Sequence, residues 1–381
     1  MEEWIAMPEK MNKSAAARKA RRAKLRRRRK IRRVLWRCTL SLLTVIVLLL
    51  AALLSAGHSA FLGPSRTVAD LLTVTMLETS ALKFVPRIYY SEPEIEAIVA
   101  RNQLGEVQEE ADTSLIVIAQ PTPEAPAPEV TPAPNAADLI TSEPTVPPLY
   151  EEDGISIFDV QGGTYNGYMM IVQDPSRVSV GVCRDGFNSK PGLLLHEIAQ
   201  RYDAVAAING GAFEDTNGQG NGGTPTGLVV SEGKLLHKAN TSSIHDITVG
   251  FNQDDILVFG RFSTAEAKEQ GLRDALAFGP VLVYNGEPAP VKGASSGLNP
   301  RTAIGQRADG AVLMLVIDGR QANSIGASYA DLIKIMLDYG AVNAVNLDGG
   351  SSSMLYYNGE YLNNGVTLTG SRRLPTAFIV R

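Results

Sequence analysis

"AVLMLVIDGRQANSIGASYADLIKIMLDYGAVNAVNLDGGSSS", residues 311–353, decides the fold of this chain. Its apolar, β-branched runs at 312–318 and 344–348 have the length and composition of buried strands. The segment 328–340 between them predicts a helix, because its apolar residues recur at helical spacing and Gly340 supplies a C-terminal stop. Those apolar residues are Leu332, Ile333, Met336 and Leu337. The stretch therefore predicts strand, helix and strand, with an Asp-Gly pair after each strand.

Short β runs of the same kind fill the segment from Tyr150 to Arg381, whereas one further helix is expected, at 192–202. The expected strands are 155–160, 168–173, 178–183, 204–209, 227–230, 247–251, 256–260, 280–284, 302–306, 312–318, 344–348, 354–357 and 376–380. Many hairpins together with two main helices indicate an α+β domain with a mixed β-sheet.

The charge is unevenly distributed along the chain. Residues 1–37 carry fifteen Lys and Arg against three acids, a net charge of +12, so the rest carries −16 of the total of −4. A nucleic-acid-binding arm would explain the arginines but not the uncharged, apolar run that begins at Cys38. Residues 38–60 are long enough to cross a bilayer, and the positive-inside rule keeps the basic tail in the cytoplasm. We expect a single-pass cell-membrane protein with an extracellular body and no nucleic-acid partner; a signal peptide cleaved near 55–57 is the alternative.

Two segments follow the apolar run before the folded body begins. Residues 61–118 predict a membrane-proximal helical stalk, in which Ser91 and Glu94 form a capping-box pattern. Residues 119–149 are rich in proline and contain no Lys, Arg or Gly, so they predict a disordered, extended spacer. The domain itself is then expected at 150–381.

Pairs of a polar residue and glycine fall into two groups. Four of them, in "VVSEGKLL", "VYNGEPA", "QRADGAVL" and "YYNGEYL", lie between matched β runs and predict hairpin turns. The other three begin with Asn209, Asp318 and Asp348, and each follows an apolar strand without a matched strand directly behind it. Functional groups are often found in such loops, so these three side chains are candidates for a site. Ordinary turns remain the alternative.

Several motifs in order resemble the phosphodiester glycosidase family: "AAINGGAF", "GGTPTGLVVSEGKLL", "FGPVLVYNGE", the long run from "NPRTAIGQ" to "NLDGGSSSMLYYNGE", and the final "RRLPTAFIV". The resemblance is strong over 204–381, weaker over 155–203, and does not extend to the first 150 residues. It implies an enzyme that cleaves the bond between the anomeric carbon of a sugar and a phosphodiester. Such a reaction needs a cationic group for the phosphate and a carboxylate for the sugar or for a water molecule.

The resemblance implies a set of site residues. Asp348 is expected as nucleophile or base, Asp318 as its partner, and Arg301 on the phosphate, because a planar guanidinium binds phosphate oxygens in pairs. The expected substrate-binding residues are Asn209, Gly210, Gly211, Thr302, Gly349, Gly350, Ser351, Ser352 and Arg373. Ser351 stands where family members often have a third glycine, and Arg373 is matched to a family arginine whose acidic neighbour is lost here.

Other readings of the domain remain open. The oxygen-rich segment 214–223 suits either a Ca²⁺ ion or a flexible lid, and otherwise we expect no cofactor and no metal site. Cys38 lies in the expected membrane span and Cys183 in the body outside it, so we expect the two cysteines to form neither a disulfide nor a metal site. The expected function is a membrane-anchored extracytoplasmic hydrolase acting on a glycan or glycopolymer with a sugar-1-phosphate linkage. A non-catalytic module that binds envelope glycans is the alternative.

Overall fold

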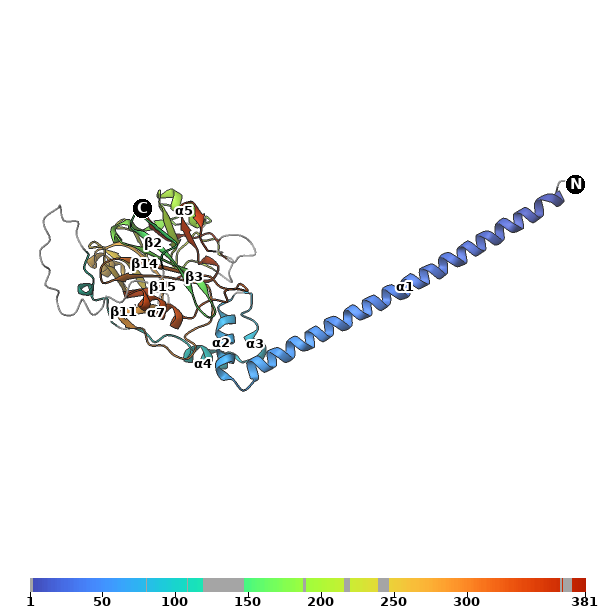
Figure 1. The fold of residues 1–381 in the computed structure, drawn as a ribbon, viewed down its shortest axis with the longest axis horizontal. Coiled ribbons are helices and arrows are strands. Elements are labelled where there is room, and N and C mark those ends of the chain that lie inside the picture. Colours follow the sequence, from blue (N-terminus) through green and yellow to red (C-terminus); the bar gives the residue numbers. More distant parts are fainter. Residues whose placement is uncertain are drawn as a thin grey trace. The chain divides into compact units, whose positions relative to one another are not determined.

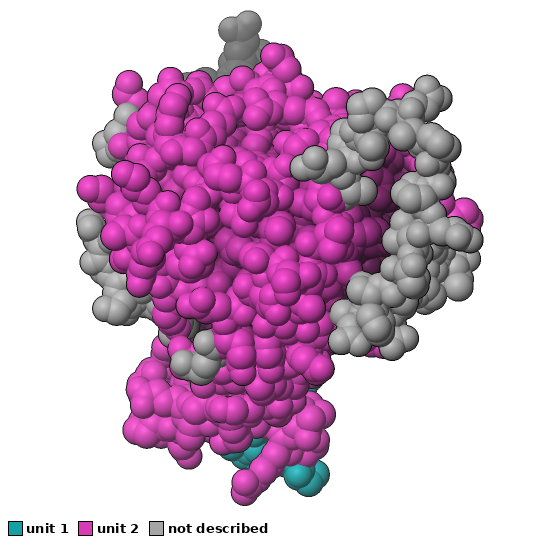
Figure 2. All heavy atoms as spheres, turned by 90° about the vertical axis from the view of Figure 1, so that its left-hand side faces the viewer, with its two compact units in different colours: residues 1–64 teal, residues 65–381 magenta. Residues whose placement is uncertain are grey.

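The computed structural model describes residues 3–79, 81–107, 109–118, 147–187, 190–215, 220–238, 247–363, 365 and 372–381. The chain divides into two compact units, residues 1–64 and residues 65–381, which are coloured separately in Figure 2. The first unit is the long helix α1 (Glu3–Leu62; Figure 1). Its part from Arg26 to Leu62 is long and apolar enough to cross a membrane, as an anchor or a signal sequence would be. Nearly all of the proline-rich segment, residues 119–146, lies outside the described residues.

The described strands of the second unit form three β-sheets. The first has the order β1 (Tyr150–Glu152), β2 (Ile155–Gln161), β3 (Asn166–Val172), β14 (Val312–Ile317), β13 (Arg301–Arg307), β15 (Ala341–Leu347), β11 (Val281–Tyr284) and β12 (Glu287–Pro288). The second has the order β7 (Lys234–His237), β6 (Val229–Ser231), β10 (Leu272–Ala277), β8 (Thr248–Asn252) and β9 (Leu257–Gly260). The third has the order β17 (Glu360–Tyr361), β16 (Leu355–Tyr357), β5 (Ala206–Asn209), β18 (Thr376–Val380) and β4 (Val178–Val182).

The expected α+β class is confirmed, but the expectation of a mixed sheet is corrected in one respect. Every strand pair within the described residues is antiparallel. Seven of these fifteen pairs join strands that are consecutive in the chain through a short turn, which favours antiparallel pairing. The four turns expected from polar-Gly pairs connect β6 to β7, β11 to β12, β13 to β14 and β16 to β17.

Two hydrophobic layers lie on opposite faces of the first sheet, and strand β14 shows why. Its side chains alternate between the faces, as the period of a strand requires. Val312, Met314 and Val316 pack in a core shared with the other two sheets. Leu313, Leu315 and Ile317 pack instead with Leu332 and Met336 of helix α7 (Tyr329–Asp338), which lies beside β11 and β15 (Figure 1). Helix α5 (Leu195–Arg201) covers the third sheet in the same way, and α6 (Thr264–Glu269) is a short helix before β10.

The segment expected as a stalk is helical and packs on the sheets. It contains α2 (Arg66–Leu77), α3 (Pro86–Tyr89), α4 (Glu92–Arg101) and the 3-10 turn η1 (Thr113–Leu115). The Ser91–Glu94 capping box is present at the start of α4. Leu104 forms a β-bridge with Val291, and the backbone N–H of Val117 donates to the carbonyl of Ala308 (2.8 Å). These contacts make the segment part of the folded unit.

Both ends of the proline-rich segment are attached to that same unit. Before it, Val117 bonds to the backbone at Ala308; after it, the N–H of Leu149 donates to the carbonyl of Ile157 (2.7 Å). This differs from the expected order of stalk, spacer and separate domain. The described residues on both sides of the proline-rich segment belong to one compact unit.

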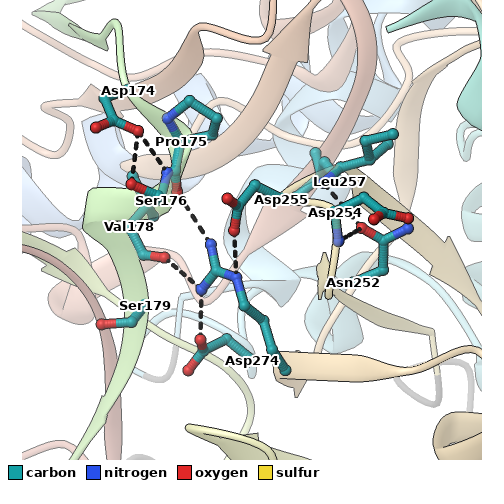
Figure 3. A network of polar contacts seen from close by, with 12 residues as sticks. Asp174, Pro175, Ser176, Val178, Ser179, Asn252, Asp254, Asp255, Leu257 and Asp274 are labelled. Atoms are coloured by element: carbon teal, nitrogen blue, oxygen red, sulfur yellow. Dashed lines mark hydrogen bonds and ion pairs between the residues drawn. The ribbon is translucent and has the colours of Figure 1, made fainter. Parts of the chain in front are cut away.

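A polar network around Arg273 connects the second sheet to the third (Figure 3). Arg273, on β10, forms ion pairs with Asp255 (2.6 Å) and with buried Asp274 (2.5 Å) and donates to the carbonyl of Val178 (2.8 Å). Asp274 in turn accepts from the backbone N–H of Val180 (2.9 Å). Burial raises the pKa of Asp274, so its carboxylate depends on these partners to remain charged.

We expect Arg273→Met to lower the free energy of unfolding by about 3 kcal/mol, because it leaves the charge of Asp274 buried with a weaker set of partners. Urea unfolding followed by circular dichroism measures the change. Arg381→Met is the matched control, since its pair with Glu232 is about half exposed and should cost less than about 1 kcal/mol. Equal losses in the two variants would mean that the network does not stabilise the fold.

Candidate active site

The loop after β15 carries the residues that the sequence singled out. Asp348 follows the strand directly, and Gly350–Ser352 form a 3-10 turn, η5. The N–H of Asp348 donates to the carbonyl of Gly210 (3.2 Å), and the N–H of Gly350 donates to the carbonyl of Pro300 (2.9 Å). Gly350 has φ +63°, in the left-handed region that favours glycine. The loop is therefore held by backbone contacts from two other parts of the domain.

Asn209, at the end of β5, lies under this loop and is fully buried. Its amide donates to the carbonyl of Asp348 (2.6 Å), and its side-chain oxygen accepts from the hydroxyl of Thr302 (2.7 Å) and the N–H of Met354 (3.1 Å). Since Thr302 is also fully buried, both residues fix the position of the loop from below. The structure thus gives Asn209 and Thr302 a positioning role rather than a surface for a ligand.

Gly210 and Gly211, which follow Asn209, have no room for a side chain. A Cβ atom on Gly210 would lie 2.5 Å from the hydroxyl of Thr376, and one on Gly211 would lie 2.5 Å from the carbonyl of Ala277. These glycines therefore allow neighbouring strands to approach each other.

Arg301, which was expected on the phosphate, is buried in this structure. Its side chain is 6% exposed, forms an ion pair with Glu78 (2.8 Å) and lies over the ring of Tyr329 at 4.3 Å. It also donates to the hydroxyl of Ser296 (2.9 Å) and the carbonyls of Gly297 (2.9 Å) and Ala327 (3.3 Å). The guanidinium is thus surrounded by acceptors from the protein itself.

Glu78 comes from the segment expected as a stalk, just after helix α2. Its carboxylate also accepts from the amide of Asn299 (2.7 Å), and its carbonyl accepts from Arg320 (3.3 Å). Arg320 reaches the Asp348 loop as well, because a Cβ on Gly350 would lie 3.3 Å from its guanidinium. Burial and the charge of Arg301 lower the pKa of Arg320. The carboxylate of Glu78 therefore supplies a counter-ion on one side of the loop.

Arg372 lies on the other side of the loop. It donates to the hydroxyl of Ser351 (3.1 Å), forms an ion pair with Asp215 (2.5 Å), and its guanidinium lies over the ring of Phe213 at 4.8 Å. Its neighbour Arg373, which the sequence favoured, bonds instead to the carbonyl of Gly192 (3.0 Å) and to Glu197 (3.3 Å). The structure brings Arg372, and not Arg373, to the Asp348 loop.

The Asp348 carboxyl lies between these groups. Burial raises its pKa to about 6, against the opposing effects of the Ser352 hydroxyl and the charge of Arg372, and the charge of Asp215 raises it further. The residue nevertheless stays partly accessible to solvent. A partly accessible carboxyl that titrates near pH 6 is suited to exchange protons at neutral pH.

Asp318 occupies a different part of the neighbourhood. Its carboxylate accepts from the amide of Asn363 (3.0 Å), which also donates to the carbonyl of Ser353 (2.9 Å) and accepts from the N–H of Leu355 (2.7 Å). Asp318 is thus linked to the far end of the loop through Asn363. The carboxylate whose charge acts on Asp348 is that of Asp215, which the sequence had placed only in an oxygen-rich loop.

Two histidines of the domain have structural partners. The ring of His196 contacts the hydroxyl of Tyr361 (3.0 Å), and that of His237 contacts the carbonyl of Gly227 (2.8 Å). Within the described part of the chain, no group of three His, Cys, Asp or Glu side chains is arranged to hold a metal ion. Residues 216–219 of the expected calcium or lid segment lie outside the described residues.

Glu78→Gln should lower the free energy of unfolding by about 1–2 kcal/mol, because it removes the counter-ion of a buried guanidinium. Thermal unfolding measures the effect, with Glu92→Gln as the control: the Glu92–Arg87 pair is exposed on both sides and should contribute little. If Glu78→Gln is no less stable than the control, the ion pair does not hold the helical segment on the sheets.

Asp348→Asn should make the chain more stable at pH 7.5 and leave its stability almost unchanged at pH 4. The carboxyl has a pKa of about 6 when folded and about 3.8 when unfolded, so the stability of the wild type falls as the pH rises from about 4 to 6. Asparagine removes that loss, which is on the order of 2 kcal/mol for a partly accessible group. Urea unfolding at the two pH values tests this; a difference that does not grow with pH would contradict it.

The sequence comparisons cover the part of the chain that contains this loop. Residues 202–381 match the family model of the phosphodiester glycosidases. The chain is 33% identical over 175 residues to YomE, an uncharacterized prophage-derived protein of Bacillus subtilis. This alignment covers 44% of this chain and 26% of that protein. It is 26% identical over 192 residues to the N-acetylglucosamine-1-phosphodiester α-N-acetylglucosaminidase of Bos taurus. That alignment covers 46% of this chain and 35% of that enzyme. The chain thus spans about a third or less of the length of these relatives.

One solved structure is similar as well. The catalytic domain of the zebrafish N-acetylglucosamine-1-phosphodiester α-N-acetylglucosaminidase, described as auto-inhibited by its pro-peptide, aligns with a TM-score of 0.49 at 24% identity. The alignment covers 60% of this chain and 82% of that one. The family resemblance seen in the sequence motifs is confirmed by the match of residues 202–381, slightly less than half of the chain, to the phosphodiester glycosidase family.

Proposed function

We propose that this protein is a membrane-anchored hydrolase that cleaves the glycosidic bond of a sugar-1-phosphodiester outside the cell. The observation that supports it most directly is the partly accessible Asp348 carboxyl, with a pKa of about 6, next to the guanidinium of Arg372. A carboxylate beside a cation is what this reaction requires, because positive charge develops on the sugar while a phosphate anion leaves.

The proposed step uses Asp348 in its ionised form, either as the nucleophile at the anomeric carbon or as the base that activates water. The anomeric carbon–oxygen bond breaks, and both bonding electrons leave with the phosphate oxygen. Water supplies the new oxygen on the anomeric carbon, either directly when Asp348 takes its proton or by hydrolysis of the glycosyl ester when Asp348 is the nucleophile, so the products are a free sugar and a phosphate monoester. A phosphate leaves readily, so a strong general acid matters less than for an ordinary glycoside. Asp318, through Asn363 and the Ser353 carbonyl, is proposed to support the loop that carries Asp348.

The location of the substrate is part of the proposal. Helix α1 joins a basic segment to an apolar one, and the positive-inside rule would place residues 65–381 on the outer side of the membrane. A sugar-1-phosphate linkage in an envelope glycan or glycopolymer would then be within reach. The alternative, a module that only binds such glycans, is less favoured, because an anionic ligand gains nothing from the Asp348 carboxylate.

The experiment uses the full chain in detergent with a synthetic α-N-acetylglucosamine-1-phosphodiester in water enriched in oxygen-18. We expect the label in the released sugar and none in the phosphate, together with a kcat/KM that decreases as the pH falls below about 6, where Asp348 becomes protonated. Asp348→Asn should reduce kcat at least about 10³-fold, since it removes the reacting carboxylate.

Asp338→Asn is the control, because Asp338 is an exposed residue on α7 that pairs with Lys334. Its activity should equal that of the wild type. Label in the phosphate would contradict cleavage at the anomeric carbon. Binding of the phosphodiester without turnover would favour the glycan-binding module.

A further inference from the structure

Three guanidinium groups surround the Asp348 loop, and they differ in what they already bind. Arg301 is 6% exposed and donates to acceptors from Glu78, Ser296, Gly297 and Ala327. Arg320 donates to the carbonyl of Glu78 and to the side chain of Asn299 (3.0 Å). Both therefore connect the helical segment 65–104 to the loop. To reach Arg301, a phosphate would have to displace several internal hydrogen bonds; Arg320 is held by two bonds from one nitrogen, both to groups on the Glu78 side of the loop.

Arg372 is held differently. Among the described residues its polar contacts are Ser351 and Asp215, and the flat face of its guanidinium rests on Phe213. Stacking on an aromatic ring fixes the plane of the guanidinium without using its N–H groups, so the donors stay available in a fixed orientation. Ser351 is three residues after Asp348, and the charge of Arg372 acts directly on the Asp348 carboxyl. The guanidinium of Arg372, with its fork of N–H donors, is thus oriented beside the Asp348 carboxyl.

The partner of Arg372 is itself an anion. The Asp215 carboxylate lies 2.5 Å from the guanidinium and its side chain is 28% exposed, so it can be exchanged for a ligand from solvent. A phosphodiester has one negative charge and two free oxygens, as a carboxylate does, and it fits the same fork. Replacement of one by the other leaves the charge at Arg372 unchanged.

We propose that Arg372 is the residue that holds the phosphate of the substrate, and that Asp215 occupies its guanidinium until the phosphate takes that place. This inference rests on the proposed function and assigns to Arg372 the role that sequence reasoning gave to Arg301. It also separates two neighbours in the chain: Arg372 binds the substrate, and Arg373 holds the backbone at Gly192.

The kinetic test compares a charged and a neutral substrate with the same sugar, an α-N-acetylglucosamine-1-phosphodiester and 4-nitrophenyl α-N-acetylglucosaminide. Arg372→Ala should lower kcat/KM for the phosphodiester about 10- to 100-fold, the range expected for loss of a hydrogen bond to a charged group. Measured at a pH well above the pKa of Asp348, so that its carboxyl stays ionised in the variant as well, the neutral glycoside should change less than about threefold. Arg372→Lys, which keeps the charge but loses the fork, should fall between the wild type and Arg372→Ala. Arg373→Ala is the matched control and should affect both substrates equally and slightly.

A binding measurement keeps the inference testable if no turnover is found. Isothermal titration of the full chain with α-N-acetylglucosamine 1-phosphate should show a Kd that rises about tenfold or more in Arg372→Ala and falls in Asp215→Asn, which removes the competing carboxylate. Melting temperatures establish that each variant is folded.

Different results would contradict the proposed hydrolase function and the proposed phosphate site at Arg372. Binding that depends on Arg372 but is followed by no hydrolysis would overturn the proposed function and support the phosphate site. Equal losses with the charged and the neutral substrate would overturn the phosphate site, because Arg372 would then only support the loop. The phosphate site would also be overturned by a Kd that is unchanged in Arg372→Ala, or by one that rises in Asp215→Asn.

Discussion

The side chain of Asn209 is the contact on which the candidate site depends. It is fully buried at the end of a strand of the third sheet, and its three hydrogen bonds reach Thr302 in the first sheet and the backbone at both ends of the Asp348 loop. A buried amide with a satisfied network of this kind specifies one arrangement of its neighbours, because any shift leaves a polar atom without a partner. Asn209 thus couples the packing of the first and third sheets to the position of the loop that carries the Asp348 carboxyl.

Most strands could be predicted from the sequence, because each is an apolar, β-branched run between turn residues. Two were not predicted: β1, a short edge strand with two glutamates, and β10, which lies in the middle of the second sheet although its sequence, LRDALA, contains two charged residues. Arg273 and Asp274 are paired with each other and bonded to the backbone of neighbouring segments, so the strand buries charges that a pattern of hydrophobicity places at the surface. Whether such charges can be buried depends on partners that are far away in the sequence and come close only in the folded structure.

The candidate site shows the same limit. The sequence located Asn209, Asp318 and Asp348 at the ends of core strands, since a polar residue after an apolar run is a local signal. The sequence alone does not distinguish Arg372 from Arg373, because the two are neighbours in the chain and only the fold decides which one reaches the Asp348 loop. It also does not predict that Glu78, 223 residues away, forms an ion pair with Arg301. The acid in "LETS" at the end of an apolar helix was the one available hint of Glu78, and Asp215 had no signal beyond an oxygen-rich loop.

The attachment of both ends of the proline-rich segment to one body has a consequence for how the protein tolerates proteases. Cleavage within residues 119–146 would break the chain without separating residues 65–118 from residues 147–381, because the two parts remain joined by the Glu78–Arg301 pair and the backbone contacts at Val291 and Ala308. A nicked molecule would run as two bands on a denaturing gel and as one particle in solution. A recombinant fragment that begins at residue 150, by contrast, would lack the counter-ion of a buried arginine, so Ser65 is the natural place to begin one.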